Sequence, residues 1–213
     1  MYQFGPWQLR WLGHDGFQLT NDQKTIYIDP YKVIGSRPAD YILLTHAHSD
    51  HLDLESIAKL RQINTVFVGP AAVTDQLDEM AITLGPGQSQ AWPELNLIAT
   101  TAYNTNKDFH PKADHLIGFI LELDGKRLYH AGDTDLITEM AELGLIDIAL
   151  LPVSGKYVMT ADEAIAAAKV IKPKVAIPMH YGAIVGSLAD AERFKLGLAD
   201  VCEVVVLNLE SAG

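Results

Sequence analysis

The sequence predicts one α/β domain built from two similar halves. Short strand-like segments come first and strand–helix alternation follows, and this order occurs twice along the 213 residues. No Ser-, Gly- or Pro-rich linker divides the chain, whose length suits one well-filled core better than two independent domains. We therefore expect a single domain over residues 1–213.

In the first half, short strands and tight turns precede the first helix. The predicted strands, which are apolar or alternating runs bounded by turn residues, are 7–12, 16–20, 24–29, 40–45 and 65–68. A helix is predicted at 52–63, where apolar residues recur at helical spacing. A second helix is predicted from Pro70 to about Met80, because proline suits the first turn of a helix.

The second half repeats this pattern. Its predicted strands are 95–101, 117–123, 126–130, 146–151, 174–178 and 203–209, with Asp124-Gly125 as a hairpin turn. Helices are predicted at 136–143, 164–171 and 187–198. Thr160 and Glu163 form a capping-box pattern before the second of these, and Pro173 ends it.

Composition and charge restrict the class of protein. Sixteen basic and 27 acidic residues leave a net charge of −11, which disfavours a nucleic-acid partner because phosphates are bound by Lys and Arg. The single Cys202 cannot form an internal disulfide, no signal peptide is visible, and the apolar runs are too short to span a bilayer. We expect a cytoplasmic protein that acts on a small molecule, and its oligomeric state stays open.

The segment His46-Ala-His48-Ser-Asp50-His51 brings three imidazoles and a carboxylate together directly after an apolar strand. Imidazole is the most common metal-binding side chain in proteins, and mixed nitrogen and oxygen ligands suit Zn, Fe, Mn or Co. In extended chain, His46 and His48 point the same way and can share one ion. The alternative is a His-rich solvated loop.

Three further candidates follow strands downstream, namely His110, Asp133 and His180. Loops that follow strands of an α/β sheet gather at one edge and build its site. A carboxylate such as Asp133 has two oxygens and can bridge two cations. Taken alone, Asp133 is as consistent with a turn and His180 with a surface histidine.

The motif resembles the HxHxDH signature of the metallo-β-lactamase fold, and Gly132-Asp133 and His180 match its later metal motifs. The Trp-Leu-Gly-His start, Ile28-Asp29-Pro30, the segment 129–134 and the segment 177–180 are similar to the branch of ascorbate-phosphate lactonase-like and N-acylphosphatidylethanolamine phospholipase D-like hydrolases. The resemblance covers essentially the whole chain. It implies a four-layer αββα sandwich with two similar halves.

The resemblance also implies two divalent metal ions, with zinc first and Mn, Fe, Ni or Co as alternatives. One ion would be held by His46, His48 and a further histidine, and the other by Asp50, His51 and His180, with Asp133 bridging. Asn104 stands where related chains often have the further histidine, and an amide is a poor zinc ligand. We expect His110 to replace it, with His115 as the alternative.

Other residues are candidates for supporting roles. Asp29 is expected to orient a ligand histidine, or else to be a turn former before Pro30. His14, Tyr157 and Asp50 are candidate catalytic groups, with His14 equally consistent with a structural role. Lys156, Asn104 and Tyr181 are candidate substrate-binding residues, for which solvation or packing is the alternative.

The leading hypothesis is a metal-dependent hydrolase. Coordination lowers the pKa of water from about 16 to about 7, so a metal-bound hydroxide would cleave an ester, lactone, amide or phosphodiester bond. Asp50 would orient that nucleophile. The alternatives are a mononuclear iron oxygenase of the same fold and a non-catalytic metal-binding protein.

Overall fold

The computed structural model describes residues 1–77 and 81–213, and within them the chain has a mixed α/β architecture with two sheets. Two compact units make up the chain. Unit 1 comprises residues 1–84 and 207–213, and unit 2 comprises residues 85–206. Each unit contains one sheet.

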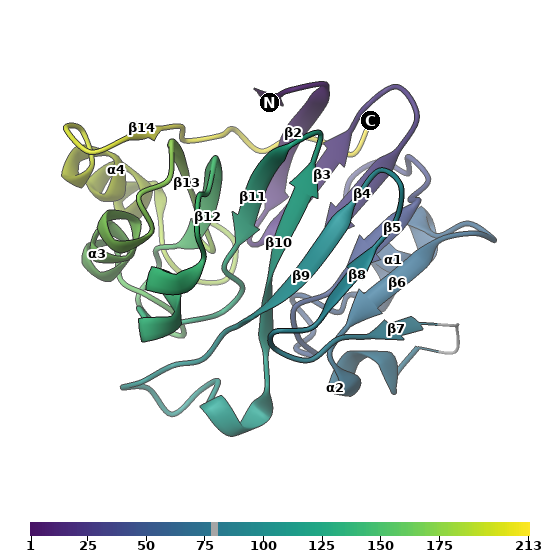
Figure 1. Ribbon diagram of the computed structural model, residues 1–213, viewed down its shortest axis with the longest axis horizontal. Helices are drawn as coiled ribbons and strands as arrows, with labels where there is room; N and C mark the ends of the chain where they lie inside the picture. Colours follow the sequence, from purple (N-terminus) through teal and green to yellow (C-terminus); the bar gives the residue numbers. More distant parts are fainter. Residues whose placement is uncertain (78–80) are drawn as a thin grey trace. The chain divides into compact units, whose positions relative to one another are not determined.

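In its described residues, unit 1 forms a seven-stranded sheet whose strands lie side by side in chain order (Figure 1). The strands are β1 (Tyr2–Phe4), β2 (Trp7–Gly13), β3 (Gly16–Thr20), β4 (Thr25–Ile28), β5 (Tyr41–Leu43), β6 (Val66–Gly69) and β7 (Ala81–Thr83). Neighbours from β1 to β4 are antiparallel, and neighbours from β4 to β7 are parallel.

Unit 2 forms a second sheet with the same plan. Its strands are β8 (Ser89–Ala91), β9 (Asn96–Thr101), β10 (Ile117–Leu123), β11 (Lys126–His130), β12 (Ile148–Pro152), β13 (Val175–Met179) and β14 (Glu203–Val204). Neighbours from β8 to β11 are antiparallel, and neighbours from β11 to β14 are parallel. The two similar halves predicted from the sequence are therefore confirmed.

This strand order decides where the loops of each unit gather. In unit 1, strands β2, β4 and β5 run in the same direction, so their carboxyl ends lie at one edge of the sheet. In unit 2, strands β9, β11, β12 and β13 do the same. The predicted site residues follow these strand ends in both units.

The longer helix of unit 1 packs on its sheet through apolar side chains. α1 (Leu54–Leu60) begins at Asp53, whose side chain accepts a hydrogen bond from Glu55 N, and it buries Ile57 and Leu60 in a cluster with sheet residues such as Ile42. The carboxyl-terminal segment joins this unit, since Leu209 bridges Trp11 and Ala212 lies in the same cluster.

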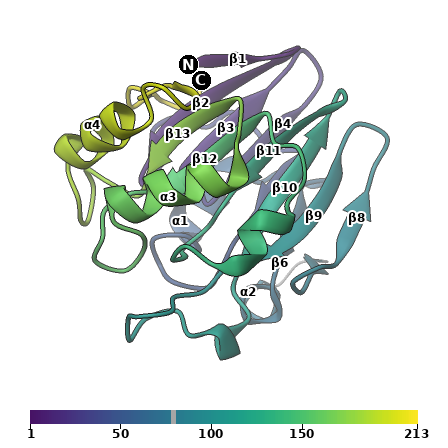
Figure 2. The same ribbon diagram turned by 60° about the vertical axis from the view of Figure 1, so that its left-hand side comes forward.

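Two helices of unit 2 lie side by side along β12 and β13 (Figure 2). α3 (Ala161–Ile171) begins at Thr160 with the predicted capping box to Glu163 and ends at Lys172 in a left-handed conformation. α4 (Leu188–Gly197) approaches α3 closely at Gly197, where a Cβ atom would lie 2.2 Å from Ile165 Cδ1. Among the described residues, no helix is long and apolar enough to cross a membrane.

Several predicted elements are shorter than expected. The helix predicted from Pro70 is only α2 (Ala71–Thr74), because the following amides bond three residues back and tighten the turn; its predicted end at Met80 lies outside the described residues. The predicted helix 136–143 is the 3₁₀ helix η2 (Thr138–Glu142). The predicted last strand 203–209 stops at Val204, because the chain then leaves for unit 1.

Three short strands were missed by the sequence analysis, namely β1, β7 and β8. Each has three residues and is an edge strand of its sheet. So short a segment shows no clear alternation, and only its backbone pairing with the neighbouring strand defines it.

Candidate metal centre

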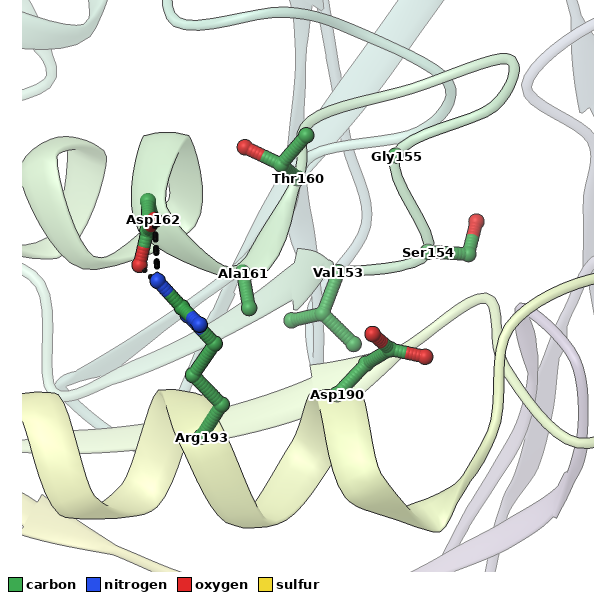
Figure 3. Close-up of a pocket in the computed structure, with 8 residues that line it drawn as sticks. All are labelled: Val153, Ser154, Gly155, Thr160, Ala161, Asp162, Asp190 and Arg193. Atoms are coloured by element: carbon green, nitrogen blue, oxygen red, sulfur yellow. Dashed lines mark hydrogen bonds and ion pairs between the residues drawn. The ribbon is translucent and has the colours of Figure 1, made fainter.

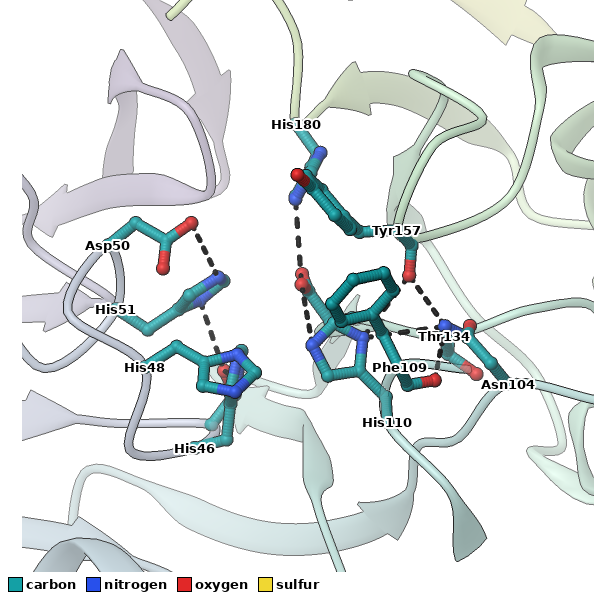
Figure 4. Close-up of polar contacts among 12 residues, drawn as sticks. His46, His48, Asp50, His51, Asn104, Phe109, His110, Thr134, Tyr157 and His180 are labelled. Atoms are coloured by element: carbon teal, nitrogen blue, oxygen red, sulfur yellow. Dashed lines mark hydrogen bonds and ion pairs between the residues drawn. The ribbon is translucent and has the colours of Figure 1, made fainter. Parts of the chain in front are cut away.

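In unit 1, the HxHxDH segment follows β5 and brings imidazole nitrogens together. Nε2 of His46 lies 3.0 Å from Nδ1 of His48, and the ring centroids of His46 and His51 are 3.9 Å apart (Figure 4). His46 and His51 are buried, whereas His48 is exposed. The strand end thus presents two adjacent nitrogen donors of His46 and His48 at the sheet edge.

Asp29 and Thr45 fix the orientation of the His46 and His51 rings. The Asp29 carboxylate accepts hydrogen bonds from Thr45 N (2.8 Å) and Thr45 Oγ1 (2.6 Å), and its Oδ2 lies 2.8 Å from His51 Nδ1. Because Thr45 Oγ1 donates to Asp29, it accepts from His46 Nδ1 at 3.0 Å. Both rings therefore turn Nδ1 toward these oxygens and Nε2 away from them.

His14 and Asp50 form a second contact at this edge. Nε2 of His14 lies 3.1 Å from Oδ2 of Asp50, and the carbonyl of His14 accepts a hydrogen bond from Trp11 Nε1 at 2.9 Å. Burial raises the pKa of Asp50, but the hydrogen bond with His14 and the charges of His51 and His14 lower that pKa well below the usual value. Asp50 is thus held as a carboxylate.

In unit 2, one carboxylate oxygen lies beside two imidazoles. Oδ2 of Asp133 is 3.6 Å from Nε2 of His110 and 3.5 Å from Nε2 of His180, and all three side chains are buried. Asp133 follows Gly132, whose φ of 64° shapes the turn and whose amide donates to His130 Nδ1 at 3.2 Å. These three residues lie far apart in the sequence and follow β9, β11 and β13.

The Nδ1 atoms of His110 and His180, which lie on the ring side away from Asp133, each contact an oxygen atom. Nδ1 of His180 lies 2.7 Å from Ser154 Oγ. Nδ1 of His110 lies 3.2 Å from the carbonyl oxygen of Tyr157 (Figure 4). A carbonyl only accepts, so Nδ1 of His110 carries a proton, and Nε2 is the nitrogen that faces Asp133. The sequence analysis assigned no role in the site to Ser154 or Thr45. Thr45 directly precedes the HxHxDH segment, and Ser154 lies two residues before Lys156.

Asn104 acts within unit 2 as a support for His110. Its backbone amide donates to the His110 carbonyl at 2.8 Å, and its side-chain amide donates to Phe109 O at 2.9 Å and to Tyr157 O at 2.6 Å. The residue is 7% exposed. The structure therefore brings His110 beside Asp133, while His115 lies exposed at the end of the 3₁₀ helix η1 (Lys112–Asp114).

The predicted substrate-binding residues differ in accessibility. Lys156 is exposed with its Nζ 4.9 Å from the centre of the Tyr157 ring, and that ring packs edge-on against Phe109 with centroids 4.8 Å apart. Tyr181 is buried, and burial followed by the charge of Glu192 raises its pKa to about 12. Lys156 and Tyr157 are therefore the accessible pair.

Four of the candidate residues have a left-handed backbone. φ is 52° at His14, 43° at Asp29, 58° at His110 and 59° at His180. Each such residue costs about 1–3 kcal/mol and persists only where its surroundings hold it. Strained residues of this kind cluster at functional sites, and these four are all predicted site residues.

A pocket of about 300 Å³ lies in unit 2 between the starts of α3 and α4 (Figure 3). Arg193 in its wall is paired with Asp162 through contacts of 2.7 and 2.6 Å, which neutralise the guanidinium. Ser154, which contacts His180, also lines this pocket. The pocket therefore lies next to Ser154, the residue that contacts the predicted ligand His180.

The donors of each unit suit a divalent metal ion. Two ligands that are each 2.0–2.1 Å from a tetrahedral zinc ion lie about 3.3 Å apart. The separations of 3.0 Å for His46 and His48, and of 3.5 and 3.6 Å around Asp133, are close to that value. Imidazoles whose Nδ1 atoms are held by oxygen partners, as in His51 and His110, are typical of metal ligands.

Comparison with known proteins supports this assignment. The family profile for the beta-lactamase superfamily domain matches residues 8–180. A UPF0173 metal-dependent hydrolase of Thermococcus onnurineus is 33% identical over 221 residues, covering 94% of this chain and 96% of that protein. One of Symbiobacterium thermophilum is 36% identical over 207 residues, covering 88% of this chain and 89% of that protein.

Solved structures show the same relationship. Igni18, a metallo hydrolase from Ignicoccus hospitalis, matches with a TM-score of 0.80 and 28% identity over 96% of both chains. CmlA, a diiron β-hydroxylase from Streptomyces venezuelae, has a TM-score of 0.75 at 11% identity over 98% of this chain and 54% of its own, and shows the fold alone. The chain therefore has the metallo-β-lactamase fold and belongs to the family of UPF0173 metal-dependent hydrolases.

Proposed function

We propose that this hydrolase uses two divalent metal ions, zinc first among them, to cleave an ester, lactone, amide or phosphodiester bond of a small molecule. Its ligands would be the residues expected from the sequence, namely His46, His48, Asp50, His51, His110, Asp133 and His180. The resemblance to ascorbate-phosphate lactonase-like and N-acylphosphatidylethanolamine phospholipase D-like hydrolases, and the absence of a disulfide from a chain with one cysteine, favour such a reaction in the cytoplasm.

The observation that carries this proposal is the environment of Asp133. A buried carboxylate oxygen lies 3.5–3.6 Å from two Nε2 atoms, and a carbonyl oxygen holds the opposite nitrogen of one of these rings. A cation held by these three groups would account for their convergence, which supports the proposal.

The chain's own residues then bind and orient the reactants. When bound, the metal ions supply Lewis acidity and activate water as the nucleophile. Asp50, oriented by His14 at 3.1 Å, would accept a hydrogen bond from the attacking water and carry its proton toward the leaving group. Tyr157 would donate a hydrogen bond to the oxygen on which charge develops, and Lys156 would bind an anionic part of the substrate.

Elemental analysis of the protein purified without chelator, combined with a panel of p-nitrophenyl esters, lactones and bis(p-nitrophenyl) phosphate, tests the proposal. We expect two metal equivalents and turnover that does not need oxygen. His46→Ala, Asp133→Ala and His180→Ala should each remove metal and turnover from a folded protein.

Full turnover by metal-depleted Asp133→Ala would contradict the mechanism. A single iron per chain with oxygen consumption would instead identify a mononuclear oxygenase of this fold. Bound metal without turnover on the whole panel would indicate a metal-binding protein that is not a catalyst.

A further inference from the structure

We propose that Asp135 is a positioning residue of the candidate metal centre in unit 2. Together with Lys107 it fastens residues 103–110, which carry His110, to the turn that carries Asp133. The sequence analysis gave no role to Asp135 or Lys107. The proposal rests on the proposed function, since it takes His110 and Asp133 to be metal ligands, and it adds the residues that keep these two ligands at a fixed separation.

Both carboxylate oxygens of Asp135 contact successive residues of this loop. Oδ2 accepts hydrogen bonds from Thr105 N at 2.7 Å, from Thr105 Oγ1 at 3.3 Å and from Asn106 N at 3.4 Å. Oδ1 forms an ion pair with Lys107 Nζ. Hydrogen bonds that an ionised group accepts are stronger than neutral ones. One side chain thus holds the loop at consecutive positions, through main-chain amides and a lysine.

Burial strengthens these contacts. The side chain of Asp135 is 2% exposed and that of Lys107 is 13% exposed, so water and salt screen the two charges only weakly. Removal of one partner of a buried ion pair leaves the other charge without compensation, which destabilises far more than loss of an exposed pair. Lys107 Nζ also donates to Asn106 Oδ1 at 2.9 Å and lies 3.8 Å from Glu163. The lysine therefore ties the loop to the start of α3 as well.

The turn that carries Asp133 is also bound to the beginning of the loop. Thr134 Oγ1 accepts a hydrogen bond from Tyr103 N at 3.2 Å and lies 3.0 Å from the Tyr103 carbonyl oxygen. The Asp135 amide donates to the same carbonyl at 3.0 Å. Residues 134 and 135 therefore fix the loop from residue 103 onward, directly next to Asp133 in the chain.

The other end of the loop returns to its start at His110. Asn104 N donates to the His110 carbonyl at 2.8 Å, and the Asn104 side chain donates to Phe109 O at 2.9 Å (Figure 4). His110 has a φ of 58°, a left-handed conformation that persists only where the surroundings hold it. Loss of the contacts at residues 105–107 would therefore loosen the loop that keeps His110 3.6 Å from Asp133.

The alternative is that the pair of Asp135 and Lys107 stabilises the fold without any effect on the ligands. A similar pair elsewhere in unit 2 separates the two explanations. Asp147 accepts hydrogen bonds from Arg127 N at 2.8 Å and from Lys174 Nζ at 2.7 Å, so it also joins a main-chain amide to a lysine. It directly precedes β12, whereas the candidate ligands follow the carboxyl ends of strands. Asp147→Asn is therefore the matched control.

Two measurements on the full-length protein test the proposal. The variants are Asp135→Asn, which keeps the shape and removes the charge, and Lys107→Met, which keeps a side chain of similar length. Hydrogen exchange of the metal-free protein, followed by NMR, reports on the Asn104 amide, whose acceptor is the His110 carbonyl. Titration with Co²⁺ against a chromophoric chelator, together with the d–d absorption, reports on metal affinity and geometry.

We expect the Asn104 amide to exchange faster, by about tenfold, in both variants, because the loop opens locally more often. One cobalt equivalent should bind about tenfold more weakly, with a changed d–d spectrum, since residues that orient metal ligands typically contribute about 10–100-fold to affinity. Asp147→Asn should match the wild type in both measurements. Far-UV circular dichroism establishes that each variant is folded, and either folded variant alone is sufficient for the test.

The outcomes separate this inference from the proposed function. Wild-type exchange or wild-type cobalt affinity in the folded variants, with metal still lost in Asp133→Ala, would overturn the inference and leave the proposed function standing. Equal effects in Asp147→Asn, or failure of both variants to fold, would also overturn it, because Asp135 would then act through the stability of the whole fold. Metal retained by Asp133→Ala would instead overturn the proposed function and leave Asp135 as a structural contact of the loop.

Discussion

Oδ2 of Asp29 lies 2.8 Å from Nδ1 of His51, and the same carboxylate holds the amide and hydroxyl of Thr45. Asp29 follows β4 and Thr45 follows β5, so the parallel pairing of these strands creates the contact. Through Thr45, the carboxylate also orients His46. One buried carboxylate therefore sets the protonation of two predicted metal ligands.

Asp29→Asn should reverse the protonation of His51. The new amide N–H would face Nδ1, which then has to accept, and the proton moves to Nε2, where it blocks metal binding. We expect metal affinity to fall by about 10–100-fold, as is typical for the loss of a ligand's hydrogen-bond partner. Zinc competition with a chromophoric chelator measures this effect, and equal affinity in both proteins would contradict it.

Asn104→Asp should release His110, although asparagine and aspartate side chains have the same shape. Asn104 Nδ2 donates to the carbonyls of Phe109 at 2.9 Å and of Tyr157 at 2.6 Å. The substitution replaces this donor by an oxygen, which faces the two carbonyls and cannot donate to them. Loss of hydrogen bonds to buried carbonyls costs about 1–3 kcal/mol each. Urea unfolding and zinc affinity should both show the loss.

Asn106→Ala is the matched control for this experiment. Asn106 lies in the same loop, and its side chain makes a long exposed contact of 3.4 Å with Glu163. Its removal should leave stability and zinc affinity close to wild type. If Asn104→Asp behaved like Asn106→Ala, the support of His110 by Asn104 would be disproved.

Tyr27 should make the protein sensitive to alkaline pH. Burial raises its pKa from 10.0 to about 12, against the opposing hydrogen bond from Gln18. A folded-state pKa above the unfolded value means that stability is complete below pH 10 and is lost as the pH rises through about 12. Tyr27→Phe should lack this loss, which urea unfolding at pH 9 to 12 measures.

At neutral pH the same variant should be less stable. The Tyr27 hydroxyl donates to the Arg37 carbonyl at 2.8 Å and accepts from Gln18 at 2.7 Å, and unpaired buried partners cost about 1–3 kcal/mol. An identical alkaline loss in the wild type and in Tyr27→Phe would show that another group is responsible.

Glu139 should titrate at unusually low pH. The hydrogen bond from Lys112 Nζ at 2.8 Å is the main reason that its pKa is lowered from 4.5 to about 2. The interaction therefore stabilises the fold above pH 4.5 and is lost as the pH falls through about 2. Lys112→Met should raise the Glu139 pKa in an NMR titration, whereas Lys59→Met, which removes the surface pair with Glu55, should not.

Local sequence patterns predicted most of the elements that position the candidate residues. The apolar run before His46, the Asp124-Gly125 turn and the Thr160–Glu163 capping box depend on neighbouring residues only, and the structure has β5, the β10–β11 hairpin and α3 at these places. Predictions failed where the end of an element depends on distant parts of the chain. The predicted strand 203–209 stops at Val204, and Leu209 at its predicted end pairs instead with Trp11 of unit 1.

The sequence by itself determined the fold class, the HxHxDH segment and the order of the ligand types, because hydrophobic periodicity and side-chain chemistry are local properties. Only the tertiary structure decided that Asp15 lies beside His51, that Asn104 supports His110, and which oxygens contact Nδ1 of His51 and of His110. These relationships depend on strand order and register, which bring residues from distant positions to one sheet edge. No pattern of neighbouring residues records such distances.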